Sequence, residues 1–587
     1  MAKRIAIVFN EKLKDMDKKK HIQSLCPVNR SGTECIKIDG SGKLLIDELT
    51  CIGCGICVKA APEAVKVINL PEALDNEPVH RYGENQFTLY NLPTPMFGKV
   101  VGIVGVNGIG KSTAIKVLAG LIKPNLGDYN KKDVKDEGFD VLVKRFRGSE
   151  SQTFFENMRD GKIKVSYKPQ HVDMISKQIK GKIGDILKKV DEKNGFDNAV
   201  EMLDLKNILN NDISTVSGGE LQRVAIAVAA LKKANLYIFD EPTSYLDIKQ
   251  RLNVAKFMKS LADENTGVLL VEHDLIILDY MTDLVHIMYG NEGAFGVVSQ
   301  LKSTKAGINI YLEGYLKEEN VRFRDHAIKF QEKPPKEGSK GNVLVSWKNV
   351  GKKLDNFSLH AKEGNLFRGE TVGVLGENGI GKTTFVKILA GVIKEYDGEI
   401  DEKVVVSYKP QYLEASDDLV MSVLYEAIRK YEVQLVRPLD LKPLLMKKLD
   451  ELSGGELQRV AIAACLSKDA GLYLLDEPSA YLDAEQRLLI SRAIRNFMTE
   501  KNTTAIIVDH DLLFLDYISE RLMVFDGKPA VEGNAKGPYE MEEGMNFFLK
   551  DVSITFRRDE ISKRPRANKP GSQLDREQKS SGKLYYG

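Results

Sequence analysis

The eleven residues Ser217-Gly-Gly-Glu-Leu-Gln-Arg-Val-Ala-Ile-Ala227 decide the fold, because the same eleven letters return from Ser453 to Ala463. An identity of this length within one chain indicates a duplicated domain. Each copy is followed by an apolar run that ends in Asp-Glu-Pro, "LYIFDEP" at 236–242 and "LYLLDEP" at 472–478. The rest of the chain is interpreted around these two copies.

A glycine-rich loop lies upstream of each copy, between an apolar run typical of a buried strand and a helical pattern. The loops are "GIVGVNGIGKST" at 102–113 and "GVLGENGIGKTT" at 373–384. Glycines permit a tight nest of backbone amides around phosphate, a lysine neutralises the β and γ phosphates, and a hydroxyl reaches Mg²⁺. The candidate nucleotide-binding residues are Gly105, Asn107, Gly108, Gly110, Lys111, Ser112 and Thr113, and then Gly376, Asn378, Gly379, Gly381, Lys382, Thr383 and Thr384.

Further motifs follow each loop in the same order and predict ATP hydrolysis. Asp240 and Asp476 are expected to hold Mg²⁺, and Glu241 and Glu477 to polarise the attacking water. The other expected participants are Gln170 and Gln411 in "SYKPQ", the signature residues Ser217, Gly218, Gly219, Glu220, Ser453, Gly454, Gly455 and Glu456, the aspartates Asp247 and Asp483, and the catalytic histidines His273 and His510. Ser112, Gln170, Thr383 and Gln411 complete the expected magnesium ligands. Together the motifs predict an α/β protein with two tandem phosphate-loop ATP-binding cassettes, mixed sheets flanked by helices, acting as an ATP hydrolase.

The first cassette carries an insertion. Gly110 and Gln170 are 60 residues apart, whereas Gly381 and Gln411 are 30 apart. The extra residues lie near 130–162, where Val141, Leu142 and Phe146 repeat with helical spacing up to a break at Gly148-Ser149, with Ser149 as the cap of a second helix. This helix–loop–helix is interpreted either as a contact element or as a surface insertion without a role.

Five of the six cysteines lie between residues 26 and 57. The spacing Cys51-x2-Cys54-x2-Cys57, with a remote Cys26-Pro27, is typical of the loops that hold iron–sulfur clusters in bacterial ferredoxins. A zinc knuckle or free thiols remain the alternatives. Cys35 is interpreted as a buried free thiol.

Composition restricts the remaining possibilities. The 587 residues carry a net charge of only +2, so binding to nucleic acid requires local patches such as Lys18, Lys19 and Lys20, which otherwise form a solvated face. No window approaches the roughly 18 apolar residues of a membrane span. The start has no secretory signal, so a cytoplasmic location is expected. The predicted units are an α+β ferredoxin-like iron–sulfur domain at 1–75, cassettes at 76–300 and 331–530, a first hinge at 301–330, and a second hinge with the tail at 531–587.

The two hinges resemble each other. Arg322-Phe-Arg324-Asp325 in the first corresponds to Phe556-Arg557-Arg558-Asp559 in the second. Arginine-rich elements at a domain junction bind either phosphates or carboxylates of the opposite domain, and the pattern leaves both open.

These motifs, with "HRYGENQF" at 80–87 and "FRGSE" at 146–150, resemble the class E ATP-binding cassette proteins, the archaeal-type ribosome-recycling factors of the RNase L inhibitor family. The resemblance spans nearly the whole chain. It implies a monomer in which ATP closes the cassettes head to tail. The iron–sulfur domain then drives the ribosomal subunits apart after a release factor or a Pelota-type rescue factor, and the protein stays on the small subunit and its rRNA. The alternatives are an ATPase subunit of a transporter, an electron carrier, or a post-splitting or initiation factor.

The resemblance also implies roles for single residues. One ATP site joins Lys111 and Glu241 to Ser453, and the other joins Lys382 and Glu477 to Ser217. Adenine is expected near Tyr82 or Phe87 in the first site and near Trp347 or Phe357 in the second.

The family pattern has eight cluster ligands, but this chain departs from it. Four of the positions are Leu13, Lys18, Ile22 and Ala61 here, while Cys26, Cys51, Cys54 and Cys57 remain. The expected cofactors are therefore ATP, Mg²⁺ and a single 4Fe–4S cluster, without the second cluster.

Overall fold

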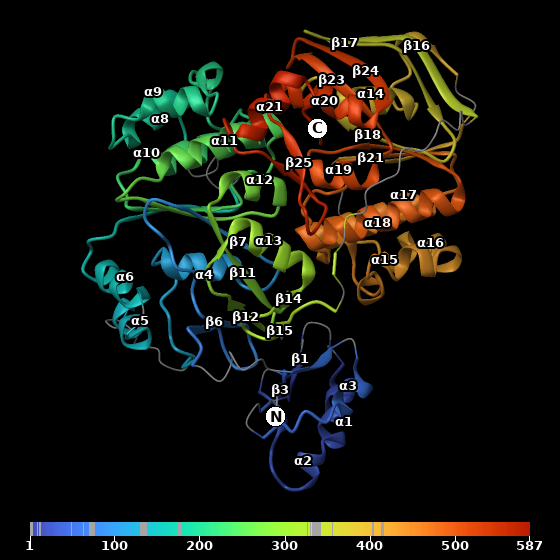
Figure 1. The fold of residues 1–587 in the computed structure, drawn as a ribbon. Helices are drawn as coiled ribbons and strands as arrows, with labels where there is room; N and C mark the ends of the chain where they lie inside the picture. The colour runs from blue at the N-terminus through green and yellow to red at the C-terminus, as the bar shows by residue number, and fades with distance from the viewer. Residues whose placement is uncertain are drawn as a thin grey trace.

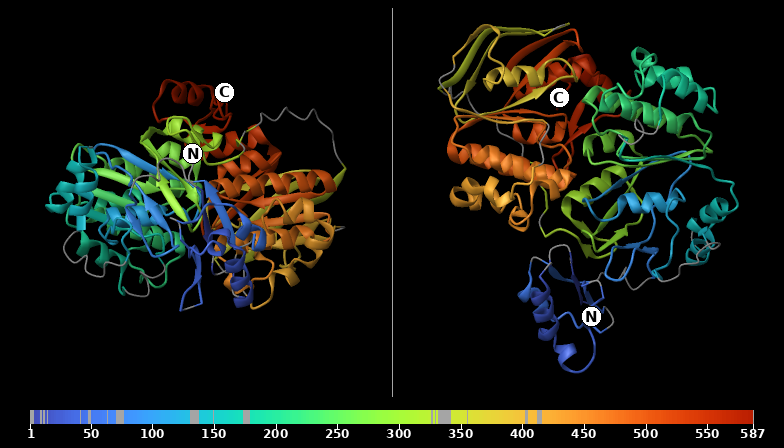
Figure 2. Two further views of the ribbon diagram at one scale, coloured as in Figure 1. Left: turned by 90° about the horizontal axis from the view of Figure 1, so that it is seen from below. Right: turned by 180° about the vertical axis from the view of Figure 1, so that it is seen from behind.

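The computed structural model describes the chain except for residues 1–3, 9, 11–12, 14, 41, 48–49, 63, 70–76, 130–137, 149, 173–178, 326, 329, 331–341, 355, 402–403, 412–415 and 587. Figure 1 shows two large α/β units side by side and a small N-terminal unit below them. The two views of Figure 2 show the same arrangement from below and from behind. In the described part of the chain, no helix is both long and apolar enough to cross a bilayer.

The N-terminal unit is built from short elements. Strand β1 (Arg4–Val8) pairs antiparallel with β4 (Val65–Asn69), and β2 (Ile36–Ile38) pairs with β3 (Leu44–Ile46). Helices α1 (Met16–Leu25), α2 (Pro27–Arg30) and α3 (Ile56–Ala60) pack beside them. Lys37 and Glu84 form an ion pair of 3.4 Å that joins this unit to the segment leading into the first cassette.

The first cassette has a mixed nine-stranded sheet. Strand β7 (Val100–Val104) lies in its middle, parallel to β10 (Gly267–Val271), beyond which lie β9 (Leu236–Asp240) and β8 (Val165–Lys168). On the other side follow β11 (Leu284–Asn291), β12 (Phe295–Val298), β6 (Thr88–Tyr90) and β5 (His80–Arg81), with β13 (Lys302–Ser303) against β11. The central parallel strands are buried on both faces, as their continuous apolar sequences require.

The second cassette repeats this strand order. Strand β18 (Thr371–Leu375) is central, with β22 (Thr504–Val508), β21 (Leu472–Asp476) and β20 (Val406–Lys409) on one side. On the other side lie β23 (Arg521–Lys528), β24 (Glu532–Glu540), β17 (Phe357–Phe367), β16 (Val343–Leu354) and β19 (Asp397–Ile400). The duplication inferred from the signature stretch is thus confirmed at the level of the fold.

Corresponding helices carry the corresponding motifs. The phosphate loops lead into α4 (Lys111–Leu118) and α14 (Lys382–Leu389), and the signature stretches form α10 (Gly218–Leu231) and α17 (Gly454–Ser467). Helices α11 (Ile248–Leu261) and α18 (Ala484–Lys501) follow the Asp-Glu-Pro motifs, and α12 (Leu275–Met281) and α19 (Leu512–Ile518) follow the histidines. Shorter helices cover each cassette, namely α8 (Ile183–Val190), α9 (Phe196–Met202), α15 (Val420–Val423) and α16 (Tyr425–Lys430).

The insertion in the first cassette forms two helices, α5 (Gly138–Arg145) and α6 (Glu150–Arg159), which pack on each other. Their aromatic side chains meet, with the rings of Phe146 and Phe155 5.2 Å apart, and join the apolar core that also contains α4. Ser149, the expected cap, lies outside the described residues.

The first hinge, which follows the first cassette, contacts the second cassette, and the second hinge, which follows the second cassette, contacts the first. The first hinge contains α13 (Thr304–Glu313), β14 (Tyr315–Leu316) and β15 (Val321–Arg322), and its Arg324 bonds Glu485 of the second cassette at 2.9 Å. The second hinge contains α20 (Met541–Asp551), β25 (Phe556–Arg558), β26 (Pro565–Ala567) and α21 (Gln573–Ser581).

In the second hinge, Arg566 holds Asp279 of the first cassette with two hydrogen bonds of 2.6 and 3.0 Å. The sequence left two kinds of partner open for these arginines, phosphates and carboxylates of the opposite domain. In the structure, Arg324 and Arg566 bind carboxylates of the opposite cassette. The crossing residues of this hinge are Arg564 and Arg566, whereas Arg558 lies 3.9 Å from Asp516 within its own cassette.

Candidate active sites

Both phosphate loops have the backbone that a phosphate nest requires. Gly110 and Gly381 are the N-caps of α4 and α14 with φ of 86° and 91°, a left-handed conformation that favours glycine. A Cβ at Gly110 would also lie 2.2 Å from the ring of Phe87, so only glycine fits. Lys111 Nζ donates to the carbonyls of Gly105 and Val106 at 2.9 and 2.7 Å. Its counterpart Lys382 makes the equivalent bonds within its own loop. Each loop therefore presents a helix N-terminus and a buried cation to an anion.

The aspartates at the ends of β9 and β21 lie beside the loop hydroxyls. Asp240 and Asp476 are buried, and Thr383 Oγ1 donates to Asp476 Oδ2 at 2.8 Å. Burial raises the pKa of Asp240, although the Ser112 hydroxyl opposes that rise. Within the described residues, both carboxylate oxygens of Asp240 and one of Asp476 are buried without a hydrogen-bond partner. An all-oxygen set of this kind fits Mg²⁺, which prefers carboxylate and hydroxyl ligands.

The glutamate after each aspartate is held in the same way in both copies. Gln170 Nε2 donates to Glu241 Oε1 at 2.7 Å, and Gln411 Nε2 donates to Glu477 Oε1 at 2.7 Å. Glu241 and Glu477 have φ of 46° and 47°, an uncommon conformation for a non-glycine residue that often marks a functional position.

The histidine ring nitrogens complete this arrangement. His273 Nε2 lies 3.3 Å from Glu241 Oε1, and His510 Nε2 lies 3.7 Å from Glu477 Oε1. The predicted glutamine, glutamate and histidine residues are thus brought together at both sites.

The two glutamates differ in their charge environment. Burial would raise the pKa of Glu241, but its interactions with His273 and Lys111 outweigh burial and hold that pKa well below its usual range. Burial raises the pKa of Glu477, and the negative charge of Asp509 raises it further. Asp509 is the residue that distinguishes "VDHD" from "VEHD" in the first copy. The two sites are therefore electrostatically unequal, through the closer histidine at Glu241 and the negative charge of Asp509 near Glu477.

The signature serines cap their helices through the glutamate three residues later. Ser217 N–H donates to Glu220 Oε2 at 2.8 Å while Glu220 N–H donates to Ser217 Oγ, and the same capping box holds Ser453 to Glu456. The box leaves each serine at the exposed tip of a helix N-terminus, which is the position for a γ-phosphate contact.

Each site also receives an aspartate from the opposite cassette. Asp483 Oδ2 accepts from Asn107 N–H in the first phosphate loop at 2.9 Å, and Asp247 Oδ2 accepts from Asn378 N–H in the second at 3.0 Å. Tyr481, two residues before Asp483, packs against Gly454 beside Ser453. The contacts therefore bring each signature segment toward the phosphate loop of the other cassette.

Four residues that hold the backbone of the site aspartates and glutamates were not predicted from the sequence. Lys168 and Lys409 donate to the carbonyls of Asp240 and Asp476, and Gln222 and Gln458 to those of Glu241 and Glu477, at 2.6–3.0 Å. Burial lowers the pKa of both lysines to about 8. All four belong to stretches that the two copies share, "SYKPQ" and "SGGELQR", so their repetition was the available signal.

The expected adenine contacts are revised in one position. Trp347 is only 2% exposed and packs edge-on against Phe385 in the core, so it cannot stack on a base. Phe357 remains, because its ring lies against Gly381 at the second phosphate loop. In the first site Phe87 takes the equivalent place, and Tyr82, 48% exposed, lies 3.2 Å from the hydroxyl of Thr113.

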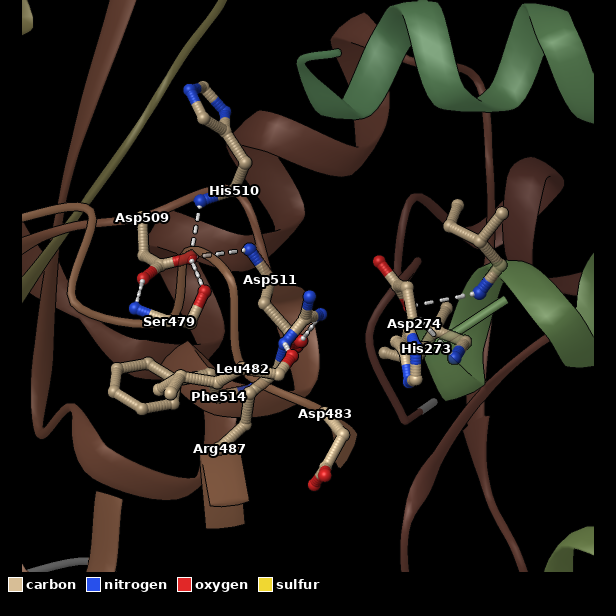
Figure 3. A network of polar contacts seen from close by, with 12 residues as sticks. His273, Asp274, Ser479, Leu482, Asp483, Arg487, Asp509, His510, Asp511 and Phe514 are labelled. Atoms are coloured by element: carbon tan, nitrogen blue, oxygen red, sulfur yellow. Dashed lines mark hydrogen bonds and ion pairs between the residues drawn. The ribbon is translucent and has the colours of Figure 1, made fainter. Parts of the chain in front are cut away.

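A buried charge cluster joins the cassettes between the two histidines. Arg251 pairs with Asp274 at 2.9 Å, Arg487 pairs with Asp511 at 2.7 Å, and Arg251 also reaches the carbonyl of His510 across the interface. Figure 3 shows the pair Arg487 and Asp511 on the side of the second cassette, with Asp274 opposite. Burial and the charge of Asp511 raise the pKa of Asp274 to about 6.

In the N-terminal unit five thiols line one small apolar cavity, Cys26, Cys35, Cys51, Cys54 and Cys57. The expected ligands thus share a cavity, and this donor set suits an iron–sulfur cluster. Among the described side chains, no three metal-binding groups already converge on a common point. Leu13, Ile22 and Ala61, three of the positions at which the family resemblance implies cluster ligands, are buried in the apolar core.

The fold and the paired sites define a twin-cassette ATP-binding cassette ATPase. A family model described as "ABC transporter" matches residues 96–244 and 359–480. The chain is 43% identical to translation initiation factor RLI1 of Saccharomyces cerevisiae, over 99% of this chain and 98% of that protein. The chain belongs to the class E ATP-binding cassette family, the RNase L inhibitor family.

Two solved structures are similar to this chain. One is archaeal ABCE1 in a model of ribosome-bound archaeal Pelota and ABCE1, with 48% identity, a TM-score of 0.92 and full coverage of both chains. The other is a complex of archaeal ribosomal stalk protein aP1 and archaeal ribosome recycling factor aABCE1, with 50% identity, a TM-score of 0.83, and coverage of 87% of this chain and 99% of that chain.

Proposed function

We propose that this ATPase recycles ribosomes. ATP closes the two cassettes head to tail, the N-terminal unit then drives the subunits apart after a release factor or a Pelota-type rescue factor, and hydrolysis resets the protein. The observation that carries the proposal is the full-length similarity, at a TM-score of 0.92, to archaeal ABCE1 bound with Pelota to the ribosome. The proposed partners are accordingly the small subunit with its rRNA and the preceding factor, and the proposed location is the cytoplasm.

The geometry supports an ATP cycle within a single chain. Lys111 and Lys382 neutralise phosphate charge, and Ser453 and Ser217 complete the sites from the opposite cassettes. Glu241 and Glu477 accept a proton from the attacking water, and hydrogen bonds from Gln170 and Gln411 position these two carboxylates. Because Asp483 and Asp247 already bridge the cassettes, nucleotide in either site is sensed by both.

The proposed cofactors follow from the donor sets. Mg²⁺ is held by Ser112, Gln170 and Asp240 in the first site and by Thr383, Gln411 and Asp476 in the second, where it would neutralise developing phosphate charge. Cys26, Cys51, Cys54 and Cys57 hold one 4Fe–4S cluster, whose role we propose to be structural. The four positions expected for ligands of a second cluster are Leu13, Lys18, Ile22 and Ala61, none of which has a side chain that binds iron, and this supports a single cluster.

The proposed units are the iron–sulfur domain at 1–75, the cassettes at 76–300 and 331–530, and the hinges at 301–330 and 531–587. The sheet orders support the two cassettes, although β13 and β24 at the starts of the two hinge segments pair within the cassette sheets. The ion pairs of Arg324 and Arg566 with the opposite cassettes support hinges that contact both cassettes. The helix–loop–helix is proposed as a contact element for the ribosome.

The test is sedimentation of ribosomes with the protein, ATP and a release or rescue factor. Conversion to free subunits is expected. It should be lost in the double variant Ser217→Arg/Ser453→Arg but kept in Ser580→Arg, which places the same charge on the exposed face of α21. Ribosomes that stay intact with the wild-type protein as well as with the variants would overturn the proposal.

A second candidate is a post-splitting or initiation role, favoured by the name of the yeast relative, translation initiation factor RLI1. In the same experiment it predicts intact ribosomes and ATP-dependent binding of the protein to isolated small subunits.

A further inference from the structure

The thiol cavity contains one cysteine more than a single cluster uses. Four cysteines satisfy a 4Fe–4S cluster, yet Cys35 lines the same cavity as Cys26, Cys51, Cys54 and Cys57. Cys35 is only 2% exposed, so it faces the cavity wall rather than solvent. Its position is fixed by two sets of hydrogen bonds, one to each neighbouring ligand segment.

The first set ties Cys35 to the turn that follows Cys26. Asn29 lies in α2, which begins directly after Cys26, and its side chain accepts from the backbone N–H groups of Cys35 and Ile36 at 2.9 and 2.7 Å. The same side chain donates to the carbonyl of Ile36 at 2.6 Å. One asparagine therefore holds the start of β2 against the turn that follows Cys26, whose thiol lines the same cavity as that of Cys35.

The second set ties Cys35 to the loop that carries Cys51. Asp47 N–H donates to the carbonyl of Cys35 at 2.7 Å, and Cys51 N–H donates to the carbonyl of Asp47 at 2.9 Å. The Cys35 thiol lies 4.0 Å from that same carbonyl. Cys35 therefore lies between the segments that carry Cys26 and Cys51, and the Asn29 side chain ties it to the turn that begins at Cys26.

We propose that Cys35 is a reserve ligand that replaces Cys26 on the cluster. In the exchange an iron–sulfur bond to Cys35 forms as the bond to Cys26 breaks, and the proton leaves the Cys35 thiol and is taken up by the Cys26 thiolate. No electron is gained or lost. The inference rests on the proposed cluster. It predicts that the cluster is retained when the Cys26 thiol is removed, because Cys35 replaces it, and is lost when the Cys54 thiol is removed.

The test measures iron and acid-labile sulfide, with the paramagnetic spectrum of the reduced cluster, on full-length chains purified without oxygen. Wild type and Cys35→Ala should each hold about four irons per chain. Cys26→Ala should keep most of this iron with an altered spectrum, whereas Cys26→Ala/Cys35→Ala and Cys54→Ala should lose it.

Equal loss of iron from Cys26→Ala and Cys54→Ala would overturn the reserve role, as would loss from Cys35→Ala alone. If Cys26→Ala does not fold, the isosteric pair Cys26→Ser and Cys26→Ser/Cys35→Ala answers the same question, because matching spectra from the two would exclude Cys35 as a ligand. Wild type without iron would refute the proposed cluster itself rather than the exchange.

Discussion

Asp483 accepts a hydrogen bond of 2.9 Å from the backbone of Asn107, although 376 residues separate them in the chain. The equivalent residues Asp247 and Asn378 make the same bond in the other direction at 3.0 Å. Each aspartate also caps the helix that follows it, through Gln486 or Gln250. A shift of either helix therefore moves the phosphate loop of the opposite cassette.

Replacing Asp483 by alanine should slow ATP hydrolysis about tenfold or more. A hydrogen bond to a charged group contributes about 1.5–3 kcal/mol, and each 1.4 kcal/mol corresponds to about a factor of ten. Asp483→Asn should be intermediate, because it keeps an acceptor for Asn107 and a helix cap. Steady-state ATP hydrolysis checks this, with Asp247→Ala as the mirror variant. Normal hydrolysis by a folded Asp483→Ala chain would contradict a role for the crossing bond.

Glu241→Gln and Glu477→Gln should each slow hydrolysis at their own site by about 10²–10⁴, the usual contribution of a general base. Glutamine keeps the shape and the contact with Gln170 or Gln411 but cannot accept the proton. The double variant should retain bound ATP and stay closed, as measured by nucleotide retained after gel filtration. Unchanged turnover in both single variants would mean that another group activates the water.

Sequence repetition was sufficient to predict the cassettes, because the phosphate-binding and water-activating residues of the ATP sites belong to motifs present twice. The aspartate, glutamate, glutamine and histidine residues were expected together, and the structure brings Glu241, Gln170 and His273 within hydrogen-bonding or ion-pair distance. Burial was less predictable. Trp347 looked available for a base, but the strand pattern alone did not show that its ring points into the core against Phe385.

Contacts between the two halves were also beyond the sequence. Nothing in the spacing indicated that Arg566 rather than Arg557 reaches across, because both lie in arginine-rich strands of similar composition. Arg557 is exposed although it is the register partner of Arg566 in the hairpin, whereas Arg566 is buried against Asp279. Likewise Cys35 stood apart in the sequence, and the hydrogen bonds through Asn29 and Asp47 place it beside the segments that carry Cys26 and Cys51.

The hinge ion pairs should stabilise the joined cassettes. Removing one partner of a buried pair costs about 3–5 kcal/mol, since it leaves a charge without compensation. Asp279→Ala should be the more destabilising variant, because Arg564 loses its ion pair and Arg566 keeps only Asp559, at 3.4 Å. Arg566→Ala should lower the free energy of unfolding by less. Arg557→Ala should leave it nearly unchanged, because the Arg557 side chain is exposed. Thermal unfolding checks the order, and a double-mutant cycle measures the coupling. Additive effects of Asp279→Ala and Arg566→Ala would show that the pair is not coupled.

Acidification should stabilise the folded chain through Asp274. Burial and the charge of Asp511 raise its pKa to about 6, against the opposing charges of Arg251 and Arg487. Burial keeps the pKa of His510 well below its usual range, so that neighbour stays neutral. The folded protein therefore holds a proton that the unfolded chain releases, and the stability linked to Asp274 is complete at low pH and lost as the pH rises through about 6.

Between pH 7.5 and 5.5 this linkage is worth about 1 kcal/mol in favour of the folded state, since one pKa unit equals about 1.4 kcal/mol. Asp274→Asn keeps the cap of α12 but cannot titrate, so the difference in unfolding temperature between wild type and this variant should change in favour of wild type as the pH falls. Asp511→Asn should move the change to lower pH, because it removes the repulsive charge. A difference that is constant with pH would show that Asp274 does not titrate in this range.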